Sequence, residues 1–340
     1  MATSALTQQP SPALFFETIN AYQKTASLKA AIELDLLTAI GEVNATSGEL
    51  ARRCGTSERG MRILCDYLVV IGFLTKEANR YGLTADSAVF LDRRSPAYLG
   101  SAIKFLLSPT LTEGFKDVAA IVRQGGTLIS EKGTMEPEHP VWMEFARTMA
   151  PVTALPAQAM AELVGARAGQ KWKVLDIAAG HGLFGLAIAR LNPNAVVVAL
   201  DWPGVLEVAK ENARAAGLDG RFDAIAGSAF EADFGEGYDL VLLTNFLHHF
   251  DPATCENLLR KVHGALGPGG RAVTLEFVPN EDRVSPPPAA SFSLMMLGTT
   301  AQGDAYTFSE YDRMFRNAGF ARSELHPLPP SFQQVIISYK

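Results

Sequence analysis

The chain has 340 residues, more than most single hydrophobic cores, so two domains are expected. With 48% hydrophobic and 19% charged residues, its composition excludes a disordered chain. The formal net charge of -6 argues against a protein that coats nucleic acid, because such proteins normally carry a basic domain.

The cysteines and the first residues narrow the cellular context. Cys54, Cys65 and Cys255 stand far apart without CxxC spacing, which predicts buried, reduced thiols and no zinc site. Residues 1–12 lack the basic and apolar regions of a secretory signal, and no uninterrupted apolar run is long enough to span a bilayer. These features predict a cytoplasmic protein that binds neither a metal nor a membrane.

The first hundred residues predict a small helical domain that ends in a hairpin. Apolar residues recur at helical spacing over 15–41, which indicates two helices or one broken helix. Thr46-Ser47 offers a capping hydroxyl for a further short helix, and Thr56-Ser57 caps another over 58–72. Residues 73–84 are typical of a short hairpin, so the order of elements is a winged-helix pattern.

A winged helix raises the alternative of a DNA-binding regulator that responds to a small ligand. The helix over 58–72 would enter the major groove, but Arg59 and Arg62 stand among many apolar residues and two acids. A helix with such a wide apolar surface favours packing or dimer formation instead.

Residues 101–168 predict a helical linker that contributes to a substrate pocket. The segment 95–123 has helical spacing with a break near Ser108-Pro109, and 141–164 is helical with interruptions at Pro151 and Pro156. The link at 165–170 is polar and glycine-containing, which places a domain boundary near 150–168. The expected parts are therefore 1–100, 101–168 and 169–340.

From residue 172 onward, strand-like runs alternate with helices, which predicts a doubly wound, mostly parallel sheet. Turns are expected between helix and strand at 192–194 and 267–270. The predicted strands are 174–177, 196–200, 222–226, 240–243, 271–277 and 334–338, and the predicted helices are 183–191, 205–216, 252–266 and 308–318.

Two glycines follow the first of these strands and precede a helix. Gly180 and Gly182 allow the backbone to approach a ligand closely, and the helix start offers unpaired N–H groups, so we expect a nucleotide-like cofactor here. With Gly185 the run also matches the dinucleotide fingerprint, and Asp201 follows at the ribose-binding distance, which leaves an NAD-dependent oxidoreductase as an alternative. Asp176 precedes the glycines, and its negative charge would favour a cationic ligand but not a pyrophosphate.

The stretch Val174–Gly182 resembles motif I of the class I S-adenosylmethionine-dependent methyltransferases. Together with the winged-helix front, Leu247-His248, Glu276 and the Gly319-Phe320 ending, the chain resembles the bacterial branch of the plant-type, caffeic-acid-like O-methyltransferases over 15–340. The resemblance implies a Rossmann-like domain with a seven-stranded sheet, an N-terminal dimerisation domain and a homodimer. It also implies S-adenosyl-L-methionine as cofactor, with S-adenosyl-L-homocysteine as product.

The same resemblance assigns cofactor contacts. Asp176 contacts the methionine end of the cofactor, directly or through water, and Asp201 binds both ribose hydroxyls. Gly180 and Gly182 let the backbone pass the cofactor, and Trp202 covers the adenine.

Several positions near the cofactor depart from the family pattern. Ser228 stands where the family has an aspartate for the adenine amino group, and its neutral hydroxyl makes a weaker hydrogen bond. Ala229 contacts the ring by packing alone, and Thr244 replaces a lysine. Ala178 replaces the first glycine of the motif, which costs little if its backbone is extended.

His248 aligns with the general base of the family, and Glu276 with the acid that orients it. A phenol has a pKa near 10, and an imidazole of pKa near 6.5 is suited to remove its proton. His249 replaces the usual acidic neighbour, and either alters the base or faces solvent. Ala305 stands where the family has a second glutamate, with Asp304 one residue away, which leaves methyl transfer to carbon or nitrogen open.

The expected reaction is O-methylation of a small aromatic or polyketide-like hydroxyl compound. Methionine side chains are flexible and polarisable, which suits an irregular aromatic ligand, and the segment at 286–288 is a candidate lid. The predicted substrate-pocket residues are Phe145, Met149, Met295 and Met296.

Overall fold

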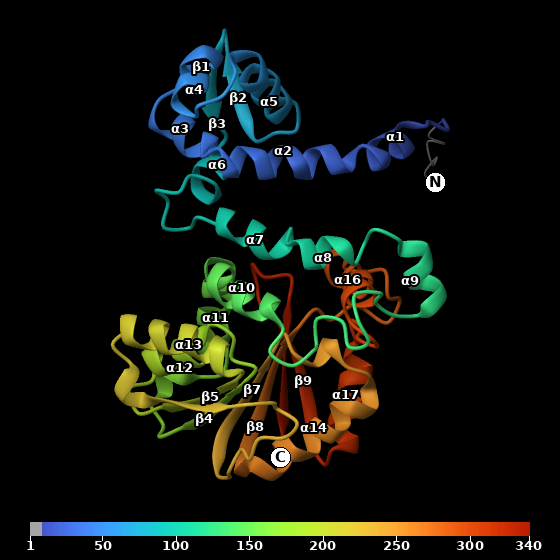
Figure 1. Cartoon of the computed structure of the whole chain (residues 1–340). Helices are drawn as coiled ribbons and strands as arrows, with labels where there is room; N and C mark the ends of the chain where they lie inside the picture. The colour runs from blue at the N-terminus through green and yellow to red at the C-terminus, as the bar shows by residue number, and fades with distance from the viewer. Residues whose placement is uncertain (1–8) are drawn as a thin grey trace, which may run out of the picture. The chain divides into compact units, whose positions relative to one another are not determined.

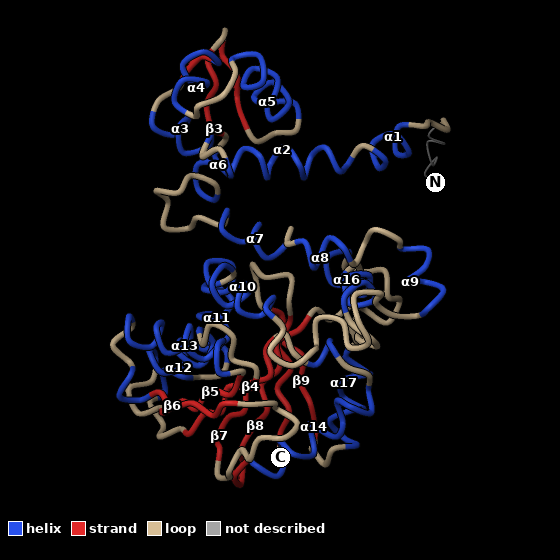
Figure 2. The backbone as a smooth tube through the Cα atoms, in the orientation of Figure 1, coloured by secondary structure: helices blue, strands red, loops and turns tan. Residues whose placement is uncertain are grey.

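The computed structural model describes residues 9–340 and divides into two compact units, residues 1–101 and 102–340 (Figures 1 and 2). Each unit has its own sheet and its own core. The predicted helical linker of 101–168 lies within the second unit, from residue 102 onward.

The first unit combines helices with a three-stranded antiparallel sheet of order β1-β3-β2. Both predicted N-caps are confirmed: the Thr46 side chain accepts from the Glu49 N–H within a capping box, and the Ser57 side chain accepts from the Gly60 N–H. The elements are α1 (Ala13–Ile19), α2 (Ala21–Glu33), α3 (Leu36–Glu42), β1 (Ala45–Thr46), α4 (Ser47–Arg53), α5 (Glu58–Val70), β2 (Leu74–Glu77), β3 (Arg80–Leu83) and α6 (Ala85–Phe90).

The two ends of the first unit differ in burial. Leu36, Leu50 and Leu68 are fully buried where α3, α4 and α5 pack together. Along α1 and the start of α2, in contrast, a row of large apolar side chains is between 50% and 75% exposed. An apolar surface of this kind normally belongs to an interface. Its members are Leu14, Phe15, Phe16, Ile19 and Tyr22.

The second unit opens with short helices instead of the long one expected over 95–123. Residues 95–99 are not helical, and Ser108 caps a new helix that has Pro109 in its first turn. Pro156, in contrast, lies inside a continuous helix. A short helix, η1 (Gly100–Ala102), spans the boundary between the units. The elements that follow it are α7 (Ile103–Leu106), α8 (Pro109–Glu113), α9 (Val118–Gln124), α10 (Pro140–Thr148), α11 (Ala150–Leu163) and η2 (Ala166–Ala168).

A seven-stranded sheet of order β6-β5-β4-β7-β8-β10-β9 forms the centre of the second unit, and it confirms the predicted fold class. The strands from β6 to β8 in this order are parallel, and β10 and β9 are antiparallel additions at one edge. The strands are β4 (Lys173–Ile177), β5 (Val196–Asp201), β6 (Phe222–Ala226), β7 (Tyr238–Thr244), β8 (Leu266–Glu276), β9 (Arg322–Pro327) and β10 (Gln334–Tyr339).

Helices cover both faces of this sheet, with α12 and α13 on one side and α14 and α17 on the other (Figure 1). Because side chains alternate along a strand, Val174 joins one core and Leu175 joins the other. Two buried layers therefore fix the strand ends that form the site. The remaining helices are α12 (Leu183–Leu191), α13 (Pro203–Ala215), η3 (Asp219–Arg221), η4 (Leu247–His249), α14 (Pro252–Ala265), α15 (Pro287–Ala290), α16 (Phe292–Thr299) and α17 (Phe308–Asn317).

Two predictions for the second unit are wrong in detail. The predicted turn at 267–270 belongs to β8, which begins at Leu266 with an irregular register against β7. Strand β9 has no apolar alternation in its sequence and was not among the predicted strands. Its edge position explains this, because one side of the strand pairs with β10 and the other has no strand neighbour.

Two further features concern residues 9–340 as a whole. The three cysteines form no disulfide; Cys65 and Cys255 are buried as predicted, whereas Cys54 is only partly buried. No helix in this part of the chain is long and apolar enough to cross a bilayer.

Candidate active site

The turn after β4 is built from residues with left-handed backbone. Gly180 and Gly182 have φ angles of 57° and 74°, as expected of glycines at a close approach. Ala178 has a φ of 53°, so the expectation of extended backbone there is wrong. The chain reverses within this turn, where the Gly182 N–H donates to the Ala179 carbonyl at 2.7 Å. The turn thus holds Ala178 in a conformation that normally favours glycine.

Asp176 lies at the end of β4 and is completely buried. Its Oδ2 accepts a hydrogen bond from the Gly185 N–H at 3.0 Å, in the first turn of α12, whereas Oδ1 has no partner within residues 9–340. Burial disfavours the charged form and raises the pKa of this carboxyl to about 7. One oxygen therefore supports the helix, and the other is buried without a partner.

Asp201 ends the neighbouring strand β5. Its two oxygens accept from the Gly180 N–H at 2.8 Å and from the Trp202 N–H at 2.7 Å, so the carboxylate holds the glycine turn as well. Burial raises its pKa to about 6, although these hydrogen bonds act in the opposite direction. Two carboxylates with raised pKa values thus meet at one edge of the sheet.

A cavity of about 490 Å³ lies at this edge. Asp201, Trp202, Ser228 and Ala229 line it, whereas Asp176, Gly180, Gly182 and Thr244 are outside its lining. The full lining consists of Lys132, Met135, Glu136, Pro137, Trp142, Ala178, Leu200, Asp201, Trp202, Gly227, Ser228, Ala229, Phe230, Glu231, Phe246, His249, Phe250, Asp251, Ala301 and Gln302.

The positions that depart from the expected pattern have local roles. The Ser228 hydroxyl accepts from the Phe230 N–H at 3.2 Å and shapes the turn after β6.

Three aromatic side chains form one wall of the cavity. Phe230, Phe246 and Phe250 contact one another with ring-centroid separations of 4.9 to 6.4 Å. This aromatic wall is suited to pack against a flat heterocycle. Thr244, at the end of β7, is buried.

His248 and Glu276 are brought together across the ends of β7 and β8, and both are buried. The imidazole Nδ1 and the carboxylate Oε2 form a short hydrogen bond. The second oxygen, Oε1, accepts from the backbone N–H groups of Phe246, Leu247 and His248 at 3.1, 3.0 and 3.4 Å. One carboxylate therefore fixes the histidine ring and the backbone turn that carries it.

His249 does not face bulk solvent, since it is only 8% exposed. Its ring contacts His248 at 4.2 Å between centroids and the edge of Trp142 at 5.1 Å. Its Nδ1 is buried without a hydrogen-bond partner in the described part of the chain. Burial, followed by the charge of His248, lowers the pKa of His249 well below the ordinary value.

The loop before α17 supports the histidine turn through its backbone. The Asp304 N–H donates to the His248 carbonyl at 3.0 Å, and a Cβ on Gly303 would lie 2.3 Å from the same oxygen. The Asp304 carboxylate pairs with Arg283 at 3.1 Å, and Ala305 is fully buried. Asp304, the acid next to the position where the family has its second glutamate, is thus paired with Arg283.

The predicted substrate residues have different positions. Phe145 stacks on His181 at 5.7 Å and lies 3.3 Å from a Cβ placed on Gly180, which puts its ring beside the glycine turn. Met149 joins α10 to α11 and is half-buried, like Met295, whereas Met296 is buried in the protein.

Two aromatic neighbours were not anticipated from the sequence. Phe292 contacts the His248 ring at 4.9 Å and stacks on Phe277 at 4.1 Å. His181 accepts from the Leu183 N–H at 3.2 Å and lies 3.0 Å from the Thr153 hydroxyl, and burial lowers its pKa to about 4. The only sequence signal was position, since His181 stands between the two glycines and Phe292 one helical turn before Met295 and Met296.

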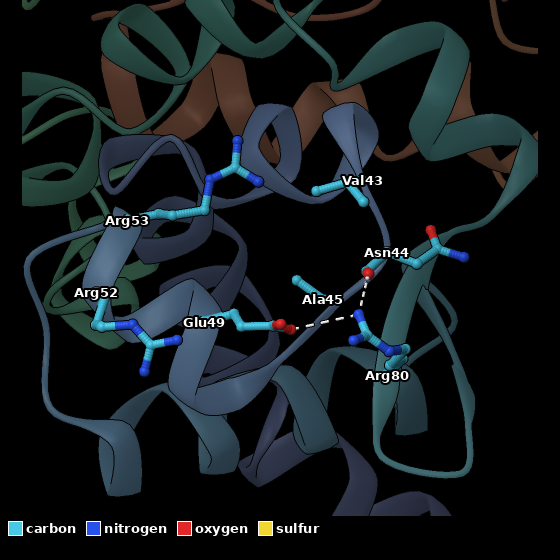
Figure 3. Close-up of a pocket in the computed structure, with 7 residues that line it drawn as sticks. All are labelled: Val43, Asn44, Ala45, Glu49, Arg52, Arg53 and Arg80. Atoms are coloured by element: carbon cyan, nitrogen blue, oxygen red, sulfur yellow. Dashed lines mark hydrogen bonds and ion pairs between the residues drawn. The ribbon is translucent and has the colours of Figure 1, made fainter.

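The first unit contains a second hollow, of about 390 Å³, lined by three arginines (Figure 3). Arg80 donates to the Asn44 carbonyl at 2.7 Å and pairs with Glu49 at 3.3 Å. Arg53 donates to the Ala39 carbonyl at 2.9 Å and pairs with Glu42. Arg52 completes the set from the last turn of α4.

Comparison with known proteins identifies both parts of the chain. Residues 126–321 match the family profile of the O-methyltransferase domain, and residues 16–93 match that of the O-methyltransferase dimerisation domain. A 3-hydroxy-5-methyl-1-naphthoate 3-O-methyltransferase from Streptomyces sahachiroi is 29% identical over 91% of this chain and 89% of its own length.

Solved structures agree with this result. One from Nostoc punctiforme, with a provisional assignment as an O-methyltransferase, is 59% identical with a TM-score of 0.94 and covers 98% of this chain and 100% of its own. Human N-acetylserotonin methyltransferase, solved in complex with SAM, shares the fold at 21% identity with a TM-score of 0.85, covering 99% of each chain.

Proposed function

This chain belongs to the O-methyltransferase family, and we propose that it methylates a hydroxyl group of a small aromatic or polyketide-like compound. Family membership favours methyl transfer to oxygen over the oxidoreductase and DNA-binding alternatives. Curated relatives named for naphthoate and tetracenomycin O-methylation support this acceptor class. The observation that carries the proposal is the buried His248–Glu276 pair at the edge of the sheet.

The cofactor is S-adenosyl-L-methionine, and the residues at the sheet edge fit it. Asp176 lies buried beneath the glycine turn, where its carboxyl would favour the cationic methionine end. Asp201 lines the cavity and can accept from the ribose hydroxyls. Trp202, Ser228 and Ala229 line the cavity where the adenine would lie, and Gly180 and Gly182 keep the backbone free of side chains. When bound, the cofactor supplies an electrophilic methyl group on its sulfonium.

His248 acts as the general base. Its Nδ1 is occupied by Glu276, so the tautomer with a proton on Nδ1 leaves Nε2 unprotonated and able to take the proton of the acceptor hydroxyl. Glu276 is fully buried, and its carboxylate stabilises the imidazolium that forms. Phe292 limits the movement of the ring by edge contact. Holding the hydroxyl in line with the methyl group supplies most of the rate.

The first unit makes the protein a homodimer. The dimerisation-domain match covers the part of the chain in which Phe16, Ile19 and Tyr22 are exposed, and burial of these side chains against a second copy removes a large apolar surface from water. We also propose the winged-helix arrangement for this unit and a cytoplasmic location for the protein. Phe145, Met149, Met295 and Met296 remain our proposed lining of the acceptor pocket, and Thr244 remains a proposed contact to the cofactor.

Incubation with methyl-labelled S-adenosyl-L-methionine and a panel of phenols and hydroxynaphthoates tests this function. Label should appear on oxygen in the product for the wild-type protein and about 10²–10⁴-fold more slowly for His248→Ala. Transfer of label to carbon or nitrogen, or unchanged turnover in His248→Ala, would contradict the proposal. Titration with NAD and with S-adenosyl-L-homocysteine distinguishes the two cofactor classes.

A further inference from the structure

We propose that Lys261 is a positioning residue for cofactor binding, whose ammonium group holds the turn after β6 in the shape that lines the cavity. Because this turn borders the place proposed for the adenine, the role rests on the proposed function. It holds for any acceptor and adds no chemical step.

Three backbone carbonyls of the turn converge on this one side chain. Lys261, near the end of α14, donates from Nζ to the Ala229 carbonyl at 3.2 Å and to the Phe230 carbonyl at 3.3 Å. It donates to the Ala232 carbonyl as well. An ammonium group has three donors, so these carbonyls use all of them. The same Nζ lies 4.1 Å from the centroid of the buried Phe234 ring, so the cation joins the turn to the core.

The N–H groups of the turn have partners inside it. The Phe230 N–H donates to the Ser228 hydroxyl at 3.2 Å, and the Glu231 N–H donates to the Ser228 carbonyl at 3.1 Å. Carbonyl oxygens that converge on one point repel one another unless a donor lies between them, and a cation is the strongest such donor. Ser228 therefore supports the N–H groups of the turn, and Lys261 supports its carbonyls.

The turn held in this way forms a continuous part of the cavity wall. Residues 227–231 all line the cavity, and Phe230 contacts Phe246 and Phe250 within the aromatic wall. Lys261 is itself outside the lining, so it can affect the cofactor only through the turn. A wall that is fixed before the ligand arrives loses less conformational entropy on binding, so loss of the cation should weaken cofactor affinity.

A second lysine makes similar contacts at the other end of the same loop, which joins β6 to β7. Lys173, at the start of β4, donates to the Glu236 carbonyl at 2.8 Å and lies 4.2 Å from the centroid of the Tyr238 ring. Both lysines are half-buried, but neither Glu236 nor Tyr238 lines the cavity. Lys173 is thus a matched control for a lysine that only supports the fold.

Calorimetric titration of the full-length protein with S-adenosyl-L-homocysteine tests this role. Lys261→Met removes the cation and keeps a side chain of similar length, and it should weaken binding about tenfold, the equivalent of one hydrogen bond. Lys261→Arg keeps a cation with several donors and should lose less affinity than Lys261→Met. Lys173→Met should bind as tightly as the wild-type protein, although both methionine variants should unfold at lower urea concentration. Circular dichroism checks the folding of each variant.

A second measurement needs no substitution. Acetylation by acetic anhydride requires that the amine leave its carbonyl partners, and mass spectrometry gives the rate at each lysine. If the contact of Lys261 with the turn favours cofactor binding, the bound cofactor must favour that contact by the same factor. Saturation with S-adenosyl-L-homocysteine should therefore slow acetylation of Lys261 about tenfold and leave the rate at Lys173 unchanged.

Four results would overturn the proposal. Lys261→Met could bind S-adenosyl-L-homocysteine as tightly as the wild-type protein, or Lys261→Arg could lose as much affinity as Lys261→Met. Lys173→Met could lose as much affinity as Lys261→Met, which would make the effect a general loss of support for the loop. Finally, S-adenosyl-L-homocysteine could leave the acetylation rate of Lys261 unchanged, and this rate decides the matter if Lys261→Met does not fold.

Failure of the proposed function gives a different result. If the affinities and acetylation rates are as expected but labelled S-adenosyl-L-methionine yields no methylated product, the assignment of O-methyl transfer fails and the role of Lys261 stands. If labelled product forms and Lys261→Met binds S-adenosyl-L-homocysteine like the wild-type protein, the function stands and the role of Lys261 fails. If the wild-type protein does not bind S-adenosyl-L-homocysteine, both fail.

Discussion

The hollow of the first unit and the strand ends beside the cavity of the second contain acidic side chains in opposite states. In the first unit, the Glu49 carboxylate accepts from the Thr46 N–H and pairs with Arg80, and its pKa is lowered by these contacts, chiefly by the hydrogen bond from the Thr46 N–H. In the second, burial raises the pKa of Asp176 to about 7, and one of its oxygens has no partner. The Glu49 carboxylate has its partners within the fold, whereas one oxygen of Asp176 has none in the described part of the chain.

The difference shows which polar groups indicate a functional site. Surface ion pairs such as Arg80–Glu49 contribute little to stability and need no ligand. Buried groups that lack a partner reduce stability until a ligand binds, and proteins retain them chiefly at functional sites. Substitutions in the two regions test this distinction, and the largest effect is expected at the His248–Glu276 pair.

Removal of the proposed base, His248, or of its partner Glu276 should have the greatest effect. His248→Ala should lower kcat by about 10²–10⁴-fold, because it removes the base. It leaves Glu276 Oε2 buried without its partner, but the three backbone N–H groups keep their acceptor, so it should cost less stability than the loss of the carboxylate. Glu276→Ala should in addition destabilise the protein by roughly 3–5 kcal/mol, since it leaves a buried histidine and three N–H groups without their acceptor. Turnover and urea unfolding, measured side by side, separate the two effects. Equal stability of the two variants would contradict the dual role of Glu276.

Asp201→Ala should weaken cofactor binding by about 100-fold, the loss of two hydrogen bonds to a charged group. Calorimetric titration with S-adenosyl-L-homocysteine measures this. Arg80→Ala, in the hollow of the first unit, is the matched control and should leave the affinity unchanged. A comparable loss in both variants would mean that the two regions do not differ in the way we describe.

Cofactor affinity should depend on pH through Asp176. Its pKa of about 7 is above the value in the unfolded chain, so the bound proton stabilises the folded protein at low pH, and this contribution is lost as the pH rises towards 7. Binding of a cationic ligand favours the ionised carboxylate, so affinity should fall up to about tenfold between pH 7 and pH 6. The thermal shift with S-adenosyl-L-methionine should therefore be larger at pH 8 than at pH 6. Asp176→Asn should remove this dependence.

Ala178→Gly should stabilise the unliganded protein by up to about 1 kcal/mol, because glycine adopts a φ of 53° without the penalty that alanine carries. Urea unfolding is the measurement. A loss of stability instead would indicate that the contact of the Ala178 methyl with the neighbouring core matters more than its backbone strain.

The smallest effect is expected from Arg52→Ala, on the hollow of the first unit. The side chain extends from the last turn of α4 beside charges that are already paired, so thermal unfolding and turnover should both be close to the wild-type values. A clear loss of turnover would show that the hollow takes part in the reaction.

Periodicity and turn chemistry predict much of this structure. The strand ends that carry Asp176, Asp201 and His248 follow from short apolar runs between turns, and the N-caps follow from single hydroxyl residues. The position of Glu276 beside His248 was implied by the family resemblance and by the adjacency of consecutive strands. These features depend on local sequence or on order along the chain.

Other features depend on packing and were not predictable. The left-handed backbone of Ala178 is imposed by the turn, not by the residue. The burial of His249 results from Trp142, which lies more than 100 positions earlier, and the contact of Phe292 with His248 joins α16 to η4. Strand β9 exists because β10 offers it a hydrogen-bonding edge, which its own sequence does not reveal.

The position of Glu276 beneath the turn also decides how an inactive form of this protein should be made. A variant that lacks the carboxylate loses the scaffold together with the chemistry, so its failure to bind a compound would carry no information. A variant that lacks only the His248 imidazole retains the turn and the shape of the cavity. Such a variant would hold acceptor and cofactor together without consuming either, and would provide a stable ternary complex for crystallography.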